Sequence, residues 1–174
     1  MNEKPSTAKI ALKWGAIAGL TTVVFQTILY LTGMYLNTSL GMVTWVFTIG
    51  GLYLAIAEYK RENGGYLSIG EGVGLGVLVA VIMGLLSTSF SLIYTHFVDP
   101  TVMQQSMELA RQRLEDQGNM TDEQVEQAME LSQKFTSPGI LLLGGVIGMA
   151  LIGAILSLII SAIMRREPAD PFSR

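Results

Sequence analysis

Long uncharged stretches constrain this chain more than any other feature. Four stretches contain no Asp, Glu, Lys or Arg: residues 14–36, 40–57, 72–98 and 137–164. The hydrocarbon core of a bilayer is about 30 Å thick and requires about 20 helical residues, so each stretch can cross it as one helix. Charged residues make up only 14% of the chain, against about 25% in a typical soluble domain. The sequence therefore predicts an all-α integral membrane protein, built as a four-helix bundle.

Charge and composition exclude several classes of function. The formal net charge of −3 provides no basic field that would attract nucleic acid, so we expect no nucleic-acid partner. The chain has no cysteine, which removes thiolate catalysis and Cys-based metal centres. We expect no cofactor and no metal.

The distribution of basic residues predicts the orientation of the spans. Eight basic residues flank the spans on the side of the termini, whereas residues 99–136 carry three basic and eight acidic residues, a net charge of −5. By the positive-inside rule, both termini are expected in the cytoplasm and residues 99–136 on the far side of the membrane. The eight basic residues are Lys4, Lys9, Lys13, Lys60, Arg61, Arg165, Arg166 and Arg174.

The segment between the third and fourth spans has the pattern of two amphipathic helices. Asp99, which precedes a proline, is a typical helix start, and Gly118 is a typical helix end. Thr121 and Gln124 have the spacing of a capping box. We expect an extramembrane helical hairpin, an acidic cap that packs on itself, docks a partner or lies on the membrane. The chain then divides into residues 1–71 (N-terminal tail, first transmembrane hairpin and cytoplasmic loop), 72–98 (third transmembrane helix), 99–136 (cap) and 137–174 (fourth transmembrane helix and cytoplasmic tail).

Small residues recur at helical spacing in three of the spans. Water does not drive helices together inside lipid, so small residues are typical of faces where two helix backbones approach closely. We expect these faces to pack within the bundle; association with a second copy or a partner helix is an alternative, and a substrate passage is another. The candidate packing residues are Gly15, Gly19, Gly72, Gly76, Ala80, Gly84, Gly144 and Gly148.

Two candidate polar sites lie at the ends of the third span. His96, the single histidine, precedes Asp99 by about one helical turn. Together these side chains could bind a cation or relay a proton, although a hydrogen-bonded histidine at the membrane interface is the simpler interpretation. Glu71 borders the apolar run, and Lys60 and Arg61 are its candidate partners. Placement of Glu71 at the membrane interface is the simpler interpretation, and a functional site is the alternative.

Within the spans, uncharged polar side chains stand out. Gln26 is the one large polar residue of the first span, and Ser and Thr cluster over residues 87–91. Hydrogen bonding between helices would account for both. The absence of charge inside the spans argues against an ion-coupled transporter.

Several motifs follow one another in an order that resembles a known family. They are a Lys-bearing N-terminus leading to Gly15 and Gly19, the segment Gly65-Tyr-Leu-Ser-Ile-Gly70, Asp99-Pro100, a polar helical insert ending at Ser137-Pro138, and a basic pair after the last span. Nearly end to end, the chain resembles a family of bacterial membrane proteins of unknown function, catalogued as domain of unknown function 4199. The resemblance implies a multi-pass protein with four spans in the bacterial cytoplasmic (inner) membrane and supplies no catalytic residues. It also implies an association with glycosyltransferases that use polyprenyl phosphates.

These observations lead us to expect a non-enzymatic membrane protein, a scaffold or accessory subunit of a cell-envelope complex. Its partners would be the lipid bilayer and a second copy or another membrane protein. A small transporter or lipid-handling protein is the alternative, and a water-accessible cavity that reaches Gln26 and the Ser/Thr cluster would favour it. An enzyme would require a pocket that brings Glu71 or His96 to a second ionisable group.

Overall fold

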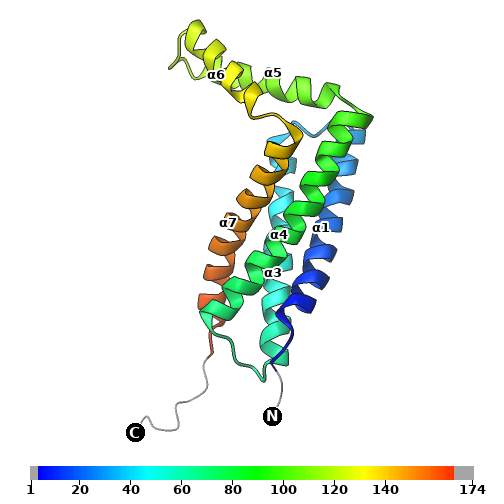
Figure 1. The fold of residues 1–174 in the computed structure, drawn as a ribbon, viewed down its shortest axis with the longest axis vertical. Helices are drawn as coiled ribbons and strands as arrows, with labels where there is room; N and C mark the ends of the chain where they lie inside the picture. The colour runs from blue at the N-terminus through cyan, green and yellow to red at the C-terminus, as the bar shows by residue number, and fades with distance from the viewer. Residues whose placement is uncertain (1–3, 167–174) are drawn as a thin grey trace.

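The computed structural model describes residues 4–166, which are helical along most of their length (Figure 1). Four helical segments are long and apolar enough to cross a membrane: Thr7–Leu31, Thr38–Glu62, Ile69–Val98 and Pro138–Met164. The predicted all-α bundle with a helical hairpin between the third and fourth spans is confirmed. Arg174 and the end of the tail lie outside the described residues. The helices are α1 (Thr7–Leu31), α2 (Thr38–Gly41), α3 (Val43–Glu62), α4 (Ile69–Ile93), the π-helix η1 (Tyr94–Val98), α5 (Thr101–Asp116), α6 (Asp122–Lys134) and α7 (Pro138–Met164).

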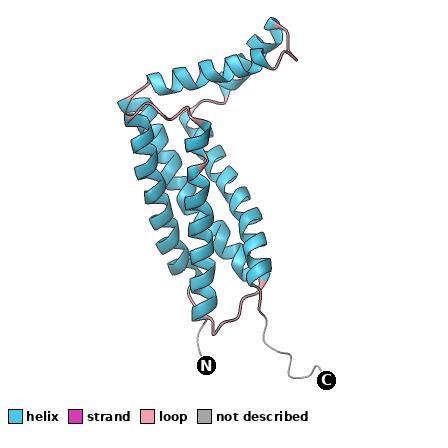
Figure 2. Cartoon of the chain, turned by 180° about the vertical axis from the view of Figure 1, so that it is seen from behind, coloured by secondary structure: helices cyan, strands magenta, loops and turns pink. Residues whose placement is uncertain are grey.

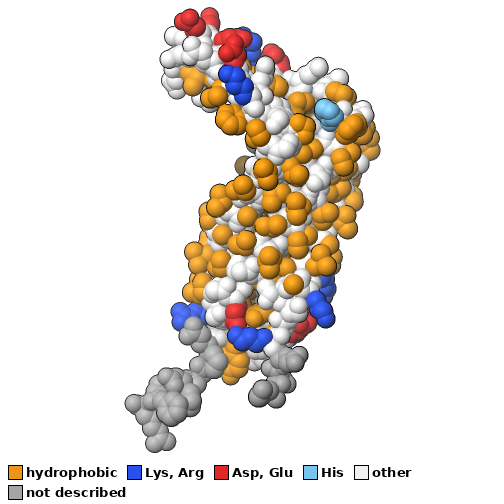
Figure 3. All heavy atoms as spheres, in the orientation of Figure 1, with side chains coloured by type: hydrophobic (Ala, Val, Ile, Leu, Met, Phe, Trp, Pro, Cys, Tyr) orange, Lys and Arg blue, Asp and Glu red, His pale blue; other side chains and the backbone are white. Residues whose placement is uncertain are grey.

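The four long helices run side by side, and α5 and α6 lie across the end of the bundle opposite the described ends of the chain (Figures 1 and 2). Helix α4 is central, since it packs against α1, α3 and α7. Apolar side chains cover the length of the bundle, whereas charged side chains gather at the end of the bundle near the termini and on the cap (Figure 3). This distribution is typical of a protein whose middle faces lipid.

Helix α1 begins earlier in the sequence than the uncharged stretch predicts. It starts at Thr7 rather than near residue 14, and the Ser6 hydroxyl accepts a hydrogen bond from Lys9 N at 3.4 Å as its N-cap. Lys13, inside the helix, forms an ion pair of 2.7 Å with Glu58 on α3. Long basic side chains can extend along the helix to the membrane interface. A transmembrane helix can therefore begin before the uncharged stretch does.

The cap, residues 99–136, has the helix starts and ends that the sequence predicts, except that α5 begins one residue later, at Thr101, with Pro100 rather than Asp99 as the N-cap residue. The Asp99 carboxylate still accepts from Thr101 N at 3.0 Å. Gly118 has a φ of 63° in the turn between α5 and α6, a conformation that favours glycine. Thr121 and Gln124 form the expected capping box.

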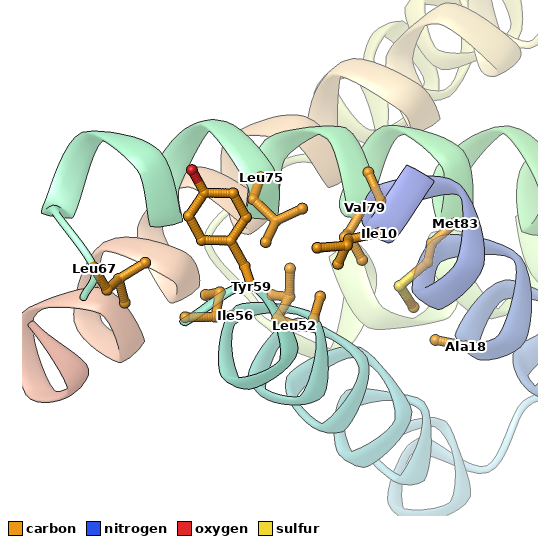
Figure 4. Close-up of a cluster of buried hydrophobic side chains, with 11 residues drawn as sticks. Ile10, Ala18, Leu52, Ile56, Tyr59, Leu67, Leu75, Val79 and Met83 are labelled. Carbon is orange, nitrogen blue, oxygen red and sulfur yellow. The ribbon is translucent and has the colours of Figure 1, made fainter. Parts of the chain in front are cut away.

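The tightly packed core lies in the half of the bundle near the termini (Figure 4). Leu52 and Ile56 of α3 meet Leu75 and Val79 of α4 there, and all four are fully buried. The adjacent loop is tied to the end of α7, because Leu67 and Arg166 exchange backbone hydrogen bonds of 2.8 and 3.0 Å. One end of the bundle is therefore closed by packing and by backbone pairing.

Small residues of α4 lie where this helix approaches α7. A Cβ added at Gly72 or Gly76 would collide with Ser161 or Ser157 of α7. Ala80 lies opposite Gly153 in the same way, and a Cβ at Gly84 would lie 2.9 Å from Met149 Cβ.

The remaining candidate packing glycines fall into two groups. On α1, a Cβ at Gly15 would lie 2.8 Å from Ile82 Cβ, and one at Gly19 would lie 2.9 Å from Leu86 Cδ1. Gly144 and Gly148 of α7 differ, because a Cβ at either would meet nothing within 4 Å. That the close approaches stabilise the bundle stays a prediction, which substitution can test.

We expect Gly76→Ala to lower the free energy of unfolding by about 1–3 kcal/mol, because the added methyl would force α4 away from Ser157. Gly74→Ala on the same helix is the matched control, since a Cβ there has no neighbour within 4 Å. Unfolding of the purified protein in detergent measures both variants. Equal stability of the two would contradict the importance of this helix contact.

Candidate functional site

A cavity of about 480 Å³ lies between the bundle and α5, at the end opposite the termini. Its polar lining comprises the Gln26 amide and the hydroxyls of Thr44, Thr88 and Ser91, among others. Leucine, valine and methionine side chains form the rest of the wall. The cavity therefore offers hydrogen-bonding groups beside apolar surface, at the end of the membrane-spanning helices.

Two further cavities adjoin this central one. One of about 460 Å³ shares Tyr35, Gly41 and Ser106 with it, and one of about 290 Å³ shares Leu92 and Thr95, among others. We call these three adjoining cavities the groove. The groove follows the underside of α5, and Figure 3 shows the surface hollowed where the cap meets the bundle.

The Gln26 amide is incompletely satisfied. Its Oε1 atom is buried and accepts no hydrogen bond from the described residues. Leaving such an atom unpaired costs about 1–3 kcal/mol, and the terminal torsion of a glutamine turns easily. A molecule in the groove that carries a hydrogen-bond donor would supply the missing partner.

Aromatic side chains order the wall beside Gln26. The Tyr30 ring stacks on Tyr94 with centroids 4.4 Å apart, and the Tyr30 hydroxyl shares a hydrogen bond of 2.9 Å with Ser91 Oγ. Tyr94 begins η1, and π-helical turns are frequent at functional sites. These contacts leave the tyrosine hydroxyl paired, in contrast to the Gln26 carbonyl.

Helix α5 lies over the groove but makes few contacts with the bundle. Val102 at its start is buried. The Tyr35 hydroxyl donates to Gln105 Oε1 at 2.6 Å, and Arg113 Nη2 donates to Thr38 Oγ1 at 3.3 Å. Burial raises the pKa of Tyr35, and the negative charge of Asp99 acts in the same direction, so the phenol stays protonated and keeps its role as donor.

Glu71 lies far from the groove, and its predicted partners are wrong. Its carboxylate pairs with Lys4 at 3.0 Å and accepts from Ser68 N at 3.1 Å in a capping box. Lys60 instead donates to the Met164 carbonyl at 2.8 Å. The capping box holds the carboxylate at the start of α4, where the N-terminal tail can reach it.

His96 and Asp99 are not joined by a hydrogen bond or ion pair among the described residues. His96 is exposed, and its ring meets Phe97 edge-on. Asp99 Oδ1 instead accepts from Thr101 Oγ1 at 2.6 Å as well as from its backbone nitrogen. Within residues 4–166, no three His, Asp or Glu side chains gather as metal ligands would.

A family model described as "Protein of unknown function (DUF4199)" matches residues 13–166. The chain belongs to the DUF4199 family. The resemblance seen in the sequence is thereby confirmed. The matched region contains the whole groove and the cap, but the family description names no activity. No curated protein and no solved structure matches this DUF4199 chain.

Sequence reasoning identified part of the groove of this DUF4199 protein and missed the rest. Gln26 and two members of the Ser/Thr cluster, Thr88 and Ser91, line its central cavity, and His96 lines the adjoining cavity of about 290 Å³. Tyr30 and Tyr35 were missed, although aromatic residues near the ends of spans are a recognisable pattern. No sequence pattern distinguished Arg113.

Gln26→Met tests whether the amide is unsatisfied in the ligand-free protein. We expect the free energy of unfolding to stay constant or rise by about 1 kcal/mol, since methionine has a similar shape and needs no partner. Ser91→Ala is the comparison, because losing its hydrogen bond with Tyr30 should cost about 1 kcal/mol. Strong destabilisation by Gln26→Met, measured by unfolding in detergent, would show that the amide is already paired.

Proposed function

We propose that this DUF4199 protein is a non-enzymatic membrane protein that binds one amphiphilic, lipid-like molecule in the groove beneath α5. The observation that supports this proposal best is the composition of the central cavity. Its volume of about 480 Å³ falls in the range of small-molecule sites. It joins an unpaired amide oxygen and several hydroxyls to apolar side chains.

The chemistry of the lining favours an amphiphile over a wholly polar or wholly apolar ligand. A polar group of the ligand could bond to Gln26 and to neighbouring hydroxyls, while Leu29, Leu92 and Leu141 would contact an apolar chain. The groove lies where the spans end and the cap begins. Lipid headgroups and the first carbons of their chains occupy this depth of a bilayer.

The absence of enzymatic activity is part of the proposal. Among the described residues, tyrosine is the only ionisable type that lines the central cavity, whereas Arg113 and His96 line the two adjoining cavities. Glu71 lies at the opposite end of α4, where it lines a separate cavity of about 340 Å³ together with Lys4 and Arg166. Its carboxylate is engaged there by Lys4 and by the capping box of α4. Acid–base chemistry needs positioned groups whose pKa values match their task, and the central cavity offers none apart from tyrosine.

We also propose that the protein lies in a bacterial cytoplasmic membrane with both termini in the cytoplasm. The excess of basic residues at the end that carries the termini supports this orientation. The groove would then face the outer leaflet, from which a lipid could enter it.

A second candidate function, that of an accessory subunit, has its own supporting observation. Helix α7 exposes Gly144 together with Leu143 and Ile147, and within residues 4–166 no other helix covers this face. A second copy or a membrane-protein partner could pack there. A glycosyltransferase that uses polyprenyl phosphates would be one such partner.

Gly41→Leu tests the lipid-binding proposal, because Gly41 lines the groove and a Cβ there meets nothing within 4 Å. The leucine should fill the site without displacing packed atoms. We expect the wild-type protein, purified in mild detergent, to retain about one lipid per chain by mass spectrometry, and Gly41→Leu to lose it.

Gly50→Leu is the matched control for this experiment. A Cβ at Gly50 also meets nothing within 4 Å, but this residue does not line the groove. It should retain lipid as the wild type does. The proposal fails if the wild type retains no lipid, or if both variants retain it equally.

Single cysteines in this Cys-free chain test the orientation. We expect an impermeant thiol reagent to label Asn119→Cys, in the turn of the cap, once the outer face of the cytoplasmic membrane is exposed. Asn63→Cys, between α3 and α4, should react only after that membrane is lysed. The opposite pattern would reverse the proposed topology.

A further inference from the structure

We infer that the groove selects an anionic amphiphile, whose acidic headgroup binds to Arg113. This inference rests on the proposed function and adds the chemical class of the ligand. Arg113 lies in the last turn of α5 and lines the cavity of about 460 Å³ that adjoins the central one. Its side chain reaches toward the bundle, since Nη2 donates to Thr38 Oγ1 at 3.3 Å.

A neighbouring arginine shows what is particular about Arg113. Arg111, two residues earlier, pairs with Glu115 at 3.0 Å and with Glu126 at 3.4 Å on α6. The charge of Arg111 is therefore neutralised by ion pairs within the cap, where this residue links α5 and α6. Arg113 has no carboxylate within 4 Å among the described residues, even though the cap carries eight acidic residues. Its positive charge is therefore uncompensated by an ion pair at the edge of the groove.

The guanidinium retains the means to bind an anion. It has five N–H donors, and the one side-chain partner that it contacts is the neutral Thr38 hydroxyl. A planar guanidinium binds phosphate and carboxylate oxygens in pairs. An acidic headgroup would supply the charge that the protein does not.

The adjoining cavities supply the place for an apolar chain. The cavity at Arg113 and the central cavity share Tyr35, Gly41 and Ser106 and therefore adjoin. For this, one molecule must extend from the first cavity into the second. Trp45 lines the cavity at Arg113 and is 45% exposed. A headgroup at Arg113 therefore places the first part of its chain beside Trp45, within reach of the central cavity.

Trp45 provides a spectroscopic test. In the Trp14→Phe protein, Trp45 is the only tryptophan, and brominated acyl chains quench a tryptophan that they contact. The detergent-solubilised protein is titrated with brominated phosphatidylglycerol and with brominated phosphatidylcholine of the same chains. We expect saturable quenching by both lipids and about five- to tenfold tighter binding of the anionic one.

Two arginine variants assign the preference. Arg113→Gln should bind both lipids with the affinity that the wild type has for phosphatidylcholine, which also shows that the variant is folded. Arg111→Gln removes the same charge from the same helix and should keep the preference for phosphatidylglycerol. Loss of the preference in both variants would overturn the role of Arg113, because the net charge of the cap would then explain it.

The remaining outcomes distinguish a failure of the anionic selectivity from a failure of the proposed lipid binding. Equal binding of both lipids by the wild type overturns anionic selectivity and leaves lipid binding intact. No saturable quenching by either lipid overturns both. Inorganic phosphate that displaces the anionic lipid at equal concentration would assign Arg113 to a free anion and overturn the amphiphile. We expect phosphate to compete only at concentrations more than about a hundredfold higher.

Discussion

The close approach of α4 to its neighbours is the constraint on which the rest of the structure depends. Inside lipid, helices associate mainly through close contact, and small residues of α4 and α1 lie at these contacts, as Gly76 does against Ser157 and Gly15 against Ile82. Most of these contacts lie in the half of the bundle near the termini. Toward the cap, larger and polar side chains such as Gln26 and Tyr30 take the place of small ones, and the central cavity lies there. The close approach of α7 to α4 continues to the level of this cavity, since a Cβ at Gly145 would lie 2.5 Å from Thr88 Oγ1 and Thr88 lines the central cavity. The groove thus forms beside this contact.

Some polar groups at the groove have a hydrogen-bond partner within residues 4–166 and others are incompletely partnered there, and the latter groups mark the candidate site. A buried polar atom far from water needs a partner. Tyr30 has one in Ser91, and Tyr35 has one in Gln105, which also steadies α5 above the cavity. Among the described residues, the Gln26 oxygen accepts no hydrogen bond and Arg113 forms no ion pair, and we propose that a ligand engages both. One offers a hydrogen-bond acceptor at depth, and the other a cation nearer the surface.

Local patterns in the sequence did not reveal which polar residues meet. His96 and Asp99 would share a face of an ideal α-helix. Residues 94–98 instead form a π-helix, which has more residues per turn, so the two side chains no longer point in the same direction. Asp99 accepts a hydrogen bond from Thr101 instead. Glu71 pairs with Lys4, 67 residues away, rather than with Lys60 or Arg61 in the last turn of α3. The capping box at Ser68 fixes the position of the Glu71 carboxylate, and the path of the N-terminal tail brings Lys4 to it.

The sequence by itself determined the four apolar spans, the capped helical hairpin between the third and fourth, and the family. Span length and helix caps depend on contiguous residues, so a linear pattern is enough to predict them. Only the tertiary structure decided which faces are covered. Gly72 and Gly76 have the same spacing as Gly144 and Gly148, yet the first pair meets α7 and the second meets nothing. Arg111 and Arg113 lie two residues apart, yet only Arg113 reaches the groove. Spacing defines a face of a helix, but the path of distant segments determines what lies against it.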